Sequence, residues 1–291
     1  MLHILCVVLY SQKERVVVTG DFSISLCYFS GIKNELDGKA IYLNNVLYNL
    51  CVEQSIFCNI STLNNGRGVI YYNSKNANLR CLSFSLISVN YGGSIFGQCS
   101  NGLITLCDVT NSVCLHFSCI TVYDNHNVTC LNSSNNVASV FGDIRLLQTT
   151  KISTNRFIRM DKASSIETLS ISGLLLQYIV LSNNNYGNNA SGGLLRLSYT
   201  SSVIEYASIF WNSGSYFVTF YQASCSISHC YTNEAQSQFS GCTLVSDFHE
   251  QCSTFTEYHS IQSTCPTHFV QSNSYLPMLS IHVFLSNFLF L

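Results

Sequence analysis

The chain has 291 residues, of which only 10% are charged, and its formal net charge at pH 7 is -2. Such sparse charge provides neither a basic surface for nucleic acid nor a polybasic membrane patch, so we expect no nucleic-acid partner. Hydrophobic residues make up 47% of the chain and aromatic residues 12%. This apolar content is enough to build a core and excludes an intrinsically disordered chain.

Residues 1–12 predict a signal peptide. A short apolar run from Ile4 to Tyr10 is followed by Ser11, Gln12 and charged residues, although no basic segment precedes the run. A buried first strand is the alternative. Four Asn-X-Ser/Thr sequons are glycosylation candidates and fit an extracellular location. They begin at Asn59, Asn127, Asn132 and Asn189.

Residues 13–240 carry a repeat. The stretches "DGKAIYLNN", "GRGVIYYNS" and "YGGSIFGQC" each place glycine, a short residue, an isoleucine and an aromatic residue in that order. Their isoleucines are Ile41, Ile70 and Ile95, spaced 29 and 25 residues apart. Looser copies lie around Val140, Leu195 and Val218. We expect the glycines at corners, where φ is positive, and the isoleucines in one inward-facing ladder.

A cysteine register repeats beside the first. Short alternating runs lead to Cys27, Cys51, Cys81, Cys107 and Cys130, with spacings of 24, 30, 26 and 23. Two of these steps follow the isoleucine spacings. We expect these cysteines to form a small apolar ladder inside the fold, because in-register side chains on parallel strands point the same way, which suits disulfides poorly. Disulfides between neighbouring coils are the alternative.

The repeat predicts an all-β fold. Period-2 runs separated by Asn, Gly and Ser clusters are typical of strands and turns, and no segment shows a sustained helical period. Units of about 25 residues fit a single right-handed parallel β-helix of eight or nine coils, stacked about 4.8 Å apart. A Cys-containing terminal segment follows at 241–275. The apolar residues 276–291 predict a cleaved lipid-anchor signal or a partial membrane span, with a last buried strand as the alternative.

The repeat motifs also suggest a family. "GGSIF", "GKAIY" and "GGLLR", together with "SIFCN" and "SIFWN", resemble the repeats of chlamydial polymorphic outer-membrane proteins and of β-helix surface families in protists such as trichomonads. The resemblance covers about residues 20–240. It implies a pectin-lyase-like β-helix at a cell surface, with adhesion as the role of many members.

Candidate chemistry is sparse. A carbohydrate-active enzyme on this fold needs two facing acids, and Asp143 and Glu167, 24 residues apart, are the pair that could stack on adjacent coils. Asp108 and Asp124 are not one coil apart. Three cysteines and three histidines alternate near the end, without the C-x2-C pair of a zinc site. They are Cys242, His249, Cys252, His259, Cys265 and His268.

Tyrosines recur beside the expected strands, where outward rings bind glycans or proteins unless they pack between coils. They are Tyr28, Tyr42, Tyr71, Tyr72, Tyr91 and Tyr221. We therefore expect a secreted or membrane-tethered surface protein with a structural or adhesive role. Its expected partner is a glycan or protein of a host or neighbouring cell, and its membrane contact the C-terminal tail. We expect no catalysis, cofactor or metal; a polysaccharide lyase or glycoside hydrolase is the alternative.

Overall fold

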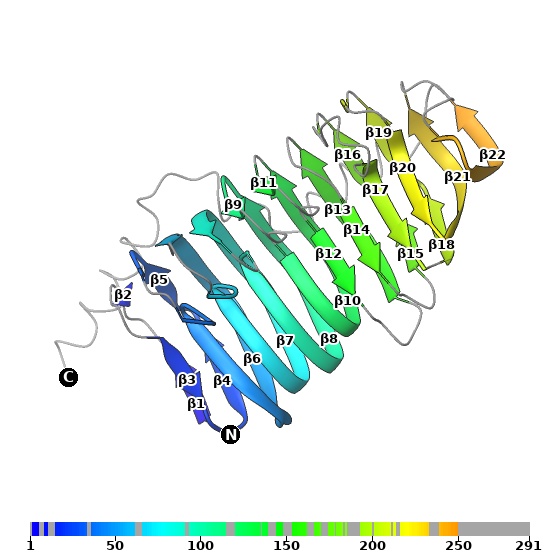
Figure 1. Cartoon of the computed structure of the whole chain (residues 1–291). Coiled ribbons are helices and arrows are strands. Elements are labelled where there is room, and N and C mark those ends of the chain that lie inside the picture. Colours follow the sequence, from blue (N-terminus) through cyan, green and yellow to red (C-terminus); the bar gives the residue numbers. More distant parts are fainter. Residues whose placement is uncertain are drawn as a thin grey trace, which may run out of the picture.

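The structure is a computed structural model. It describes residues 2–5, 9–10, 15–33, 36–61, 66–90, 93–114, 120–134, 136–138, 144–147, 153–161, 166–169, 174–177, 179–182, 184, 193–199, 201–210, 212–213, 216–232 and 239–249. Strands dominate this described part, which contains no α-helix. Parallel strands stack along one axis as a β-solenoid, so the predicted all-β parallel β-helix is confirmed, while its right-handed winding stays a prediction (Figure 1).

The strands are β1 (Leu2–Leu5), β2 (Leu9–Tyr10), β3 (Val16–Val18), β4 (Phe22–Ser25), β5 (Tyr28–Ser30), β6 (Ile41–Ser61), β7 (Ile70–Val89), β8 (Ile95–Thr110), β9 (Val113–Cys114), β10 (Ile120–Ser134), β11 (Val137–Ala138), β12 (Ile144–Leu147), β13 (Ser153–Asp161), β14 (Ile166–Leu169), β15 (Leu174–Gln177), β16 (Val180–Ser182), β17 (Gly193–Ser198), β18 (Ser201–Glu205), β19 (Ser208–Phe210), β20 (Tyr216–Tyr221), β21 (Ser224–Thr232) and β22 (Cys242–His249).

One inward-facing column runs along the stack, and we call it the isoleucine column. Each member pairs in parallel register with the next, in the order Val16, Ile41, Ile70, Ile95, Ile120, Ile144, Ile166, Leu195 and Val218. Ile41, Ile70 and Ile95 have no exposed surface. Burying one such side chain contributes about 1.5–3 kcal/mol, so the column is a principal source of stability.

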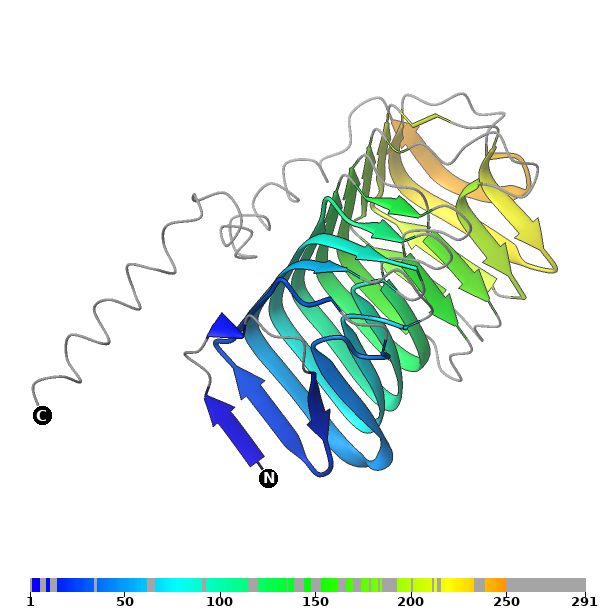
Figure 2. The ribbon, with the colours of Figure 1, turned by 60° about the vertical axis from the view of Figure 1, so that its left-hand side comes forward.

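The number of coils differs from the prediction of eight or nine. The structure forms about five turns. Between Val16 and Ala138 the strands are long, and they bend from one side of a turn to the next (Figure 2). Beyond Ala138 shorter strands continue the same columns, with residues outside the description between them. Dividing the chain length by one repeat length overcounted because it assumed equally complete turns throughout.

A second inward column is aromatic. Phe29, Phe57 and Phe84 pair in register on β5, β6 and β7, and all three are buried. Their ring centroids lie 4.9 and 4.8 Å apart, with interplanar angles of 3° and 11°. Each aromatic pair adds about 0.5–1.5 kcal/mol beyond its burial.

Two corners of the turns use left-handed backbone without relying on glycine. One corner holds Leu26, Gln54, Cys81 and Leu106, with φ between 46° and 56°. The other holds Gly31, Asn59, Leu86 and Asn111, with φ between 50° and 68°. Only the corner before the isoleucine column has glycines with positive φ, at Gly38, Gly68 and Gly93. The expectation that glycines form the corners therefore holds for one corner of three.

The predicted cysteine ladder is wrong. Cys51 pairs with Asn78, and Cys107 pairs with Leu131. Cys27 and Cys107 are buried, Cys51 is half-buried in an outward position, and Cys81 lies in the first left-handed corner. Cys130, between the paired residues Thr129 and Leu131, follows the register of that corner. The turns differ in length, so evenly recurring cysteines fall at different positions within each turn.

Both ends of the predicted solenoid extend further in the structure. In the predicted leader, β1 pairs with β4 and β2 pairs with β5. In the predicted terminal segment, β22 pairs with β21. Among the described residues, no helix is long and apolar enough to cross a bilayer. The tail at 276–291 lies outside the described residues, so the signal peptide and the membrane attachment stay predictions.

The isoleucine column predicts a large stability loss on truncation. We expect Ile70→Ala to lower the free energy of unfolding by about 2–5 kcal/mol, because it leaves a cavity between Ile41 and Ile95. Urea unfolding measures the loss. Val17→Ala is the control; this side chain is 54% exposed, so its change should stay within about 0.5 kcal/mol. Equal effects of the two substitutions would contradict the inward stacking.

The second left-handed corner predicts a stabilising substitution. Leu86 is 57% exposed and has φ of 54°, whereas Asn59 and Asn111 occupy the same corner on neighbouring turns. Asparagine adopts this backbone more readily than leucine does, so we expect Leu86→Asn to raise the free energy of unfolding by up to about 1 kcal/mol. Leu103→Asn makes the same chemical change on an exposed strand position and should give no gain. A loss of stability in Leu86→Asn would contradict this account.

Candidate functional site

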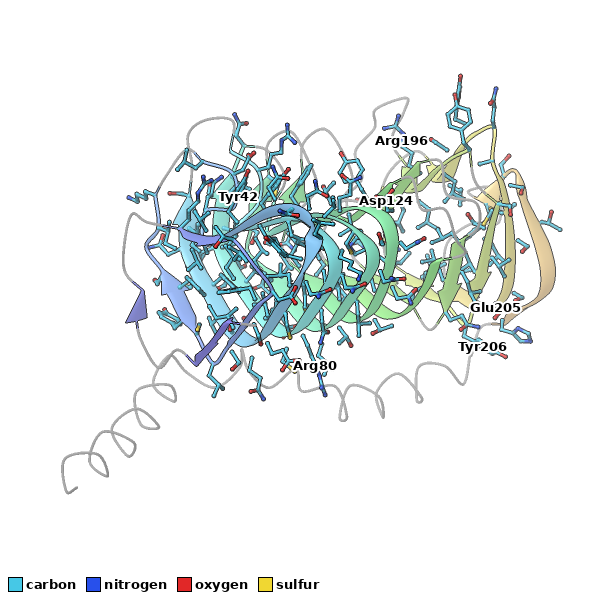
Figure 3. The ribbon with its side chains drawn as sticks, turned by 90° about the horizontal axis from the view of Figure 1, so that it is seen from below. Tyr42, Arg80, Asp124, Arg196, Glu205 and Tyr206 are labelled. Carbon is cyan, nitrogen blue, oxygen red and sulfur yellow. The ribbon has the colours of Figure 1, made fainter. Side chains whose placement is uncertain are left out.

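The solenoid has two outward sides with different side chains. Figure 3 shows Tyr42, Asp124 and Arg196 on one side of the stack and Arg80, Glu205 and Tyr206 on the opposite side. Inward and outward positions alternate along each strand, so the residue after each isoleucine faces outward. The first side therefore begins next to the isoleucine column.

A row of aromatic rings lies on this first side. We call Tyr42, Tyr71, Phe96 and Tyr123 the aromatic column. The rings of Tyr42, Tyr71 and Phe96 stack with centroids 5.2 and 5.7 Å apart and interplanar angles of 16° and 5°. Tyr123 extends the row at 5.5 Å, tilted by 50°. Burial is the main reason that the pKa of Tyr71 is raised.

Two arginines cover the aromatic column. The Arg15 guanidinium lies 4.3 Å from the ring centre of Tyr42, and that of Arg67 lies 5.4 Å from Phe96. Both arginines are tied to Asp37: its carbonyl oxygen accepts from Arg15, and its carboxylate accepts from the Arg67 backbone N–H at 2.7 Å. The stacked rings thus turn their faces toward one another and toward arginine, and present edges and hydroxyls outward. Sugar stacking on an open ring face does not suit this column.

An amide row runs parallel to the stack axis. The Asn76 side chain donates to Asn49 at 2.7 Å, and Asn101 donates to Asn76 at 3.2 Å. The Asp21 carboxylate ends the row by accepting from the backbone and side-chain N–H groups of Asn49, at 2.8 and 3.0 Å. Asn73 likewise donates to Asn44 at 3.2 Å. The sequence analysis missed this row, although its spacings follow those of the isoleucines.

The opposite side is polar and mixed in charge. Glu53, Arg80, Thr105 and Thr129 stand in one register, and Gln177 and Glu205 pair in register on later rungs. The Thr129 hydroxyl donates to that of Thr105 at 2.9 Å, and the Gln177 amide donates to the Glu205 carboxylate at 2.7 Å. This side therefore offers hydrogen-bonding groups without one dominant charge.

A buried lysine fixes the corner beside the aromatic column. Lys39 has no exposed surface, and its ammonium donates to the carbonyls of Gly66 at 2.8 Å and Leu36 at 3.3 Å. Burial lowers its pKa to about 8, against a raising effect of Asp37. The ammonium joins successive turns at this corner.

A polar cluster also lies inside the core. The Tyr72 hydroxyl is 2.7 Å from Nε2 of His126, and Sγ of Cys99 is 3.4 Å from the same nitrogen. All three side chains are at most 2% exposed. Because Nε2 faces two possible donors, it is the accepting nitrogen of a neutral imidazole. The imidazole also hydrogen-bonds to the backbone of Tyr123.

Two glycines make room for this core cluster. Tyr72 stacks on Gly97, and His126 stacks on Gly102. A Cβ atom at Gly97 would overlap the Tyr72 ring, and one at Gly102 would overlap the His126 ring. The glycines of these two strands therefore allow close packing of the rings.

The core cluster is held neutral. Burial lowers the pKa of His126 to about 4 and raises that of Cys99 to about 12. Burial also raises the pKa of Tyr72 well above its ordinary value. A nucleophilic cysteine needs an accessible thiolate, so this Cys–His contact is not an activated pair. It acts as a packed, hydrogen-bonded part of the core.

The structure places the predicted sequons differently. Asn59 is exposed in a left-handed corner, and Asn127 is exposed on β10. The backbone of Asn132 pairs with Asp108, while Asn189 lies outside the described residues.

The predicted carboxylate pair does not stack. Arg145, not Asp143, pairs with Glu167, because the step between these turns is 22 residues, from Ile144 to Ile166, rather than 24. Asp143 itself lies outside the described residues. On the first side, the Asp124 carboxylate accepts from Gln98 at 2.9 Å. Asp108 is largely buried and pairs in register with Ser83.

The remaining candidates are dispersed. Cys242 and His249 lie at the two ends of β22, while Cys252, His259, Cys265 and His268 lie outside the described residues. The described residues contain no group of three His, Cys, Asp or Glu side chains suited to a metal. Of the tyrosines, Tyr72 points inward, Tyr28 is half-buried on β5, Tyr221 is exposed, and Tyr91 is outside the description.

Comparison with known proteins gives no relative. No protein-family model matches the chain, and no curated protein matches it. The parallel β-solenoid agrees with the β-helix repeat that the motifs predicted. The link to chlamydial or trichomonad families is without support from these comparisons.

The core cluster predicts a stability loss in acid. The pKa of His126 is about 4 in the folded chain, against 6.5 for an ordinary histidine. The unfolded chain therefore binds more protons between these values, and folding loses about 1.4 kcal/mol per pH unit as pH falls from 6.5 toward 4. This contribution is fully present above pH 6.5. Thermal unfolding at several pH values measures it.

His126→Gln is the matched control, because its amide oxygen can still accept from Tyr72 but does not titrate in this range. We expect the variant to be less stable at pH 7 and to lose less stability on acidification. Parallel pH profiles for the two proteins would contradict a neutral buried imidazole.

Proposed function

We propose that this protein is a secreted or membrane-tethered surface protein with a structural or adhesive role. The observation that carries the proposal is the repetition of outward side chains along the solenoid. The aromatic column and the amide row both extend over successive turns. A partner meeting this side would find the same groups again at each rung, about 4.8 Å apart. Many weak, equal contacts then combine through multivalency.

The chemistry of this side favours a neutral, hydrogen-bonding partner. Ring edges, phenol hydroxyls and amides are its outward groups, and only 10% of the chain is charged. A glycan or an extended protein segment of a neighbouring cell surface supplies complementary hydroxyl or amide groups. A partner recognised mainly by charge fits poorly.

The sequons support an extracellular place for the protein. Both Asn59 and Asn127 are exposed, so an oligosaccharide at either position would project into solvent. Attachment to a membrane through residues 276–291 belongs to the same proposal. No described residue bears on that segment.

The proposal predicts that the tyrosine hydroxyls of the aromatic column contribute to adhesion. We expect Tyr42→Phe/Tyr71→Phe to weaken binding about tenfold, since two hydrogen bonds of about 0.5–1.5 kcal/mol each are lost while ring stacking is kept. The measurement is binding of the purified full chain to immobilised neutral and acidic polysaccharides and to fixed cells.

Tyr221→Phe is the control, because it removes an exposed hydroxyl far from the aromatic column. Unchanged binding of the double variant would refute the role of this side. Reducing ends or unsaturated products released from the polysaccharides would instead favour the carbohydrate-active enzyme, which needs two facing acids.

A further inference from the structure

Two cysteines face each other across neighbouring strands near the end of the described stack. Cys225 on β21 pairs in parallel register with Cys242 on β22. Figure 1 shows these two strands side by side at the end of the solenoid. Elsewhere in the described chain, the register places other residue types beside cysteine, such as Asn78 beside Cys51 and Leu131 beside Cys107.

The two thiols have unequal surroundings. Cys225 is only 3% exposed and belongs to the core, whereas Cys242 is half-buried and packs against the core's edge. A hydrogen bond from Cys225 lowers the pKa of Cys242, and this effect outweighs burial, which acts in the opposite direction. By contrast, burial raises the pKa of Cys99 and of Cys107 to about 12. Cys242 is therefore the more reactive thiol of the pair.

We propose that Cys225 and Cys242 form a reversible disulfide that fastens β22 to β21. The co-reactant is a low-molecular-weight disulfide such as oxidised glutathione. This site is separate from the aromatic column and does not depend on the adhesive role. It makes the attachment of the last described strand sensitive to redox conditions.

The geometry favours a bond that forms but is easily reduced. In-register residues of neighbouring strands have Cα atoms about 4.8 Å apart, within the disulfide range of about 4.4–6.8 Å. Their Cβ atoms point the same way, so closure requires a small shift of one strand. The pairing of β21 with β22 already has an irregularity after Ile227, and among the described strands β22 pairs with β21 alone. A strained disulfide is more readily reduced than a relaxed one.

The reaction proceeds by two thiol–disulfide exchanges. The Cys242 thiolate attacks one sulfur of oxidised glutathione; the glutathione S–S bond breaks and the first glutathione thiolate leaves. Cys225, after losing its proton, attacks Sγ of Cys242 in the mixed disulfide, and the second glutathione thiolate leaves. The two cysteines are oxidised by two electrons, glutathione disulfide is reduced to two thiols, and the cysteine protons end on these thiols.

The test is oxidation of the folded full chain in mixtures of oxidised and reduced glutathione. Free thiols are then alkylated in denaturant, and cross-linked peptides are mapped by mass spectrometry. We expect the Cys225–Cys242 link to exceed any other intramolecular link about tenfold, because the register gives this pair a high effective concentration. Reduction should restore both thiols. Preferential links between other cysteines, or equal alkylation of Cys225 and Cys51 after oxidation, would overturn the proposal.

Two variants test the roles of the thiols. Cys225→Ser should accumulate glutathione on Cys242, since the resolving thiol is missing, whereas Cys242→Ser should leave Cys225 largely unmodified. Cys51→Ser is the control and should leave the link intact. A Cys225→Ser chain without glutathione at Cys242 would overturn the assigned order of attack. The wild-type mapping decides the link itself even if a variant folds poorly.

Discussion

The parallel register between neighbouring turns is the constraint on which the rest of this structure depends. Each residue lies about 4.8 Å above its equivalent, so a side chain's environment is set chiefly by the residues directly above and below it. Isoleucine on isoleucine fills the interior without cavities, and asparagine on asparagine satisfies its amides along the row. The same rule stacks Phe57 between Phe29 and Phe84. Like groups are repeated because each neighbour is compatible with its own kind.

The register also determines where backbone strain is tolerated. Twelve described residues other than glycine have positive φ, and most lie at corners that stack on one another. Left-handed backbone costs about 1–2 kcal/mol for an ordinary residue. The corner of Leu26, Gln54 and Cys81 connects strands whose inward residues are buried, and each buried aliphatic side chain contributes about 1.5–3 kcal/mol. Burial within the turn therefore offsets the corner that closes it.

The sequence allowed prediction of the fold class and of the isoleucine repeat, because glycine, isoleucine and aromatic residue stay in fixed order over three turns. It could not place the cysteines. A difference of a residue or two in the length of a corner moves Cys81 to the corner while Cys107 stays inside. The core cluster was also beyond prediction: Tyr72 and His126 are 54 residues apart in the chain, and their contact needs two glycines from an intervening strand. Tyr71 and Tyr72 are neighbours of one type, yet they face opposite sides.

Cysteine chemistry in this fold follows position within a turn rather than composition. Cys99 and Cys107 lie among buried side chains, where the thiolate is strongly disfavoured, so they act as small apolar residues. Cys242 lies at the edge of the core and has a second thiol in register, which stabilises its thiolate. A solenoid holds its middle turns from both sides, whereas an end strand is held from one. A redox-sensitive bond at β22 thus acts where a single cross-link changes the attachment of a strand most.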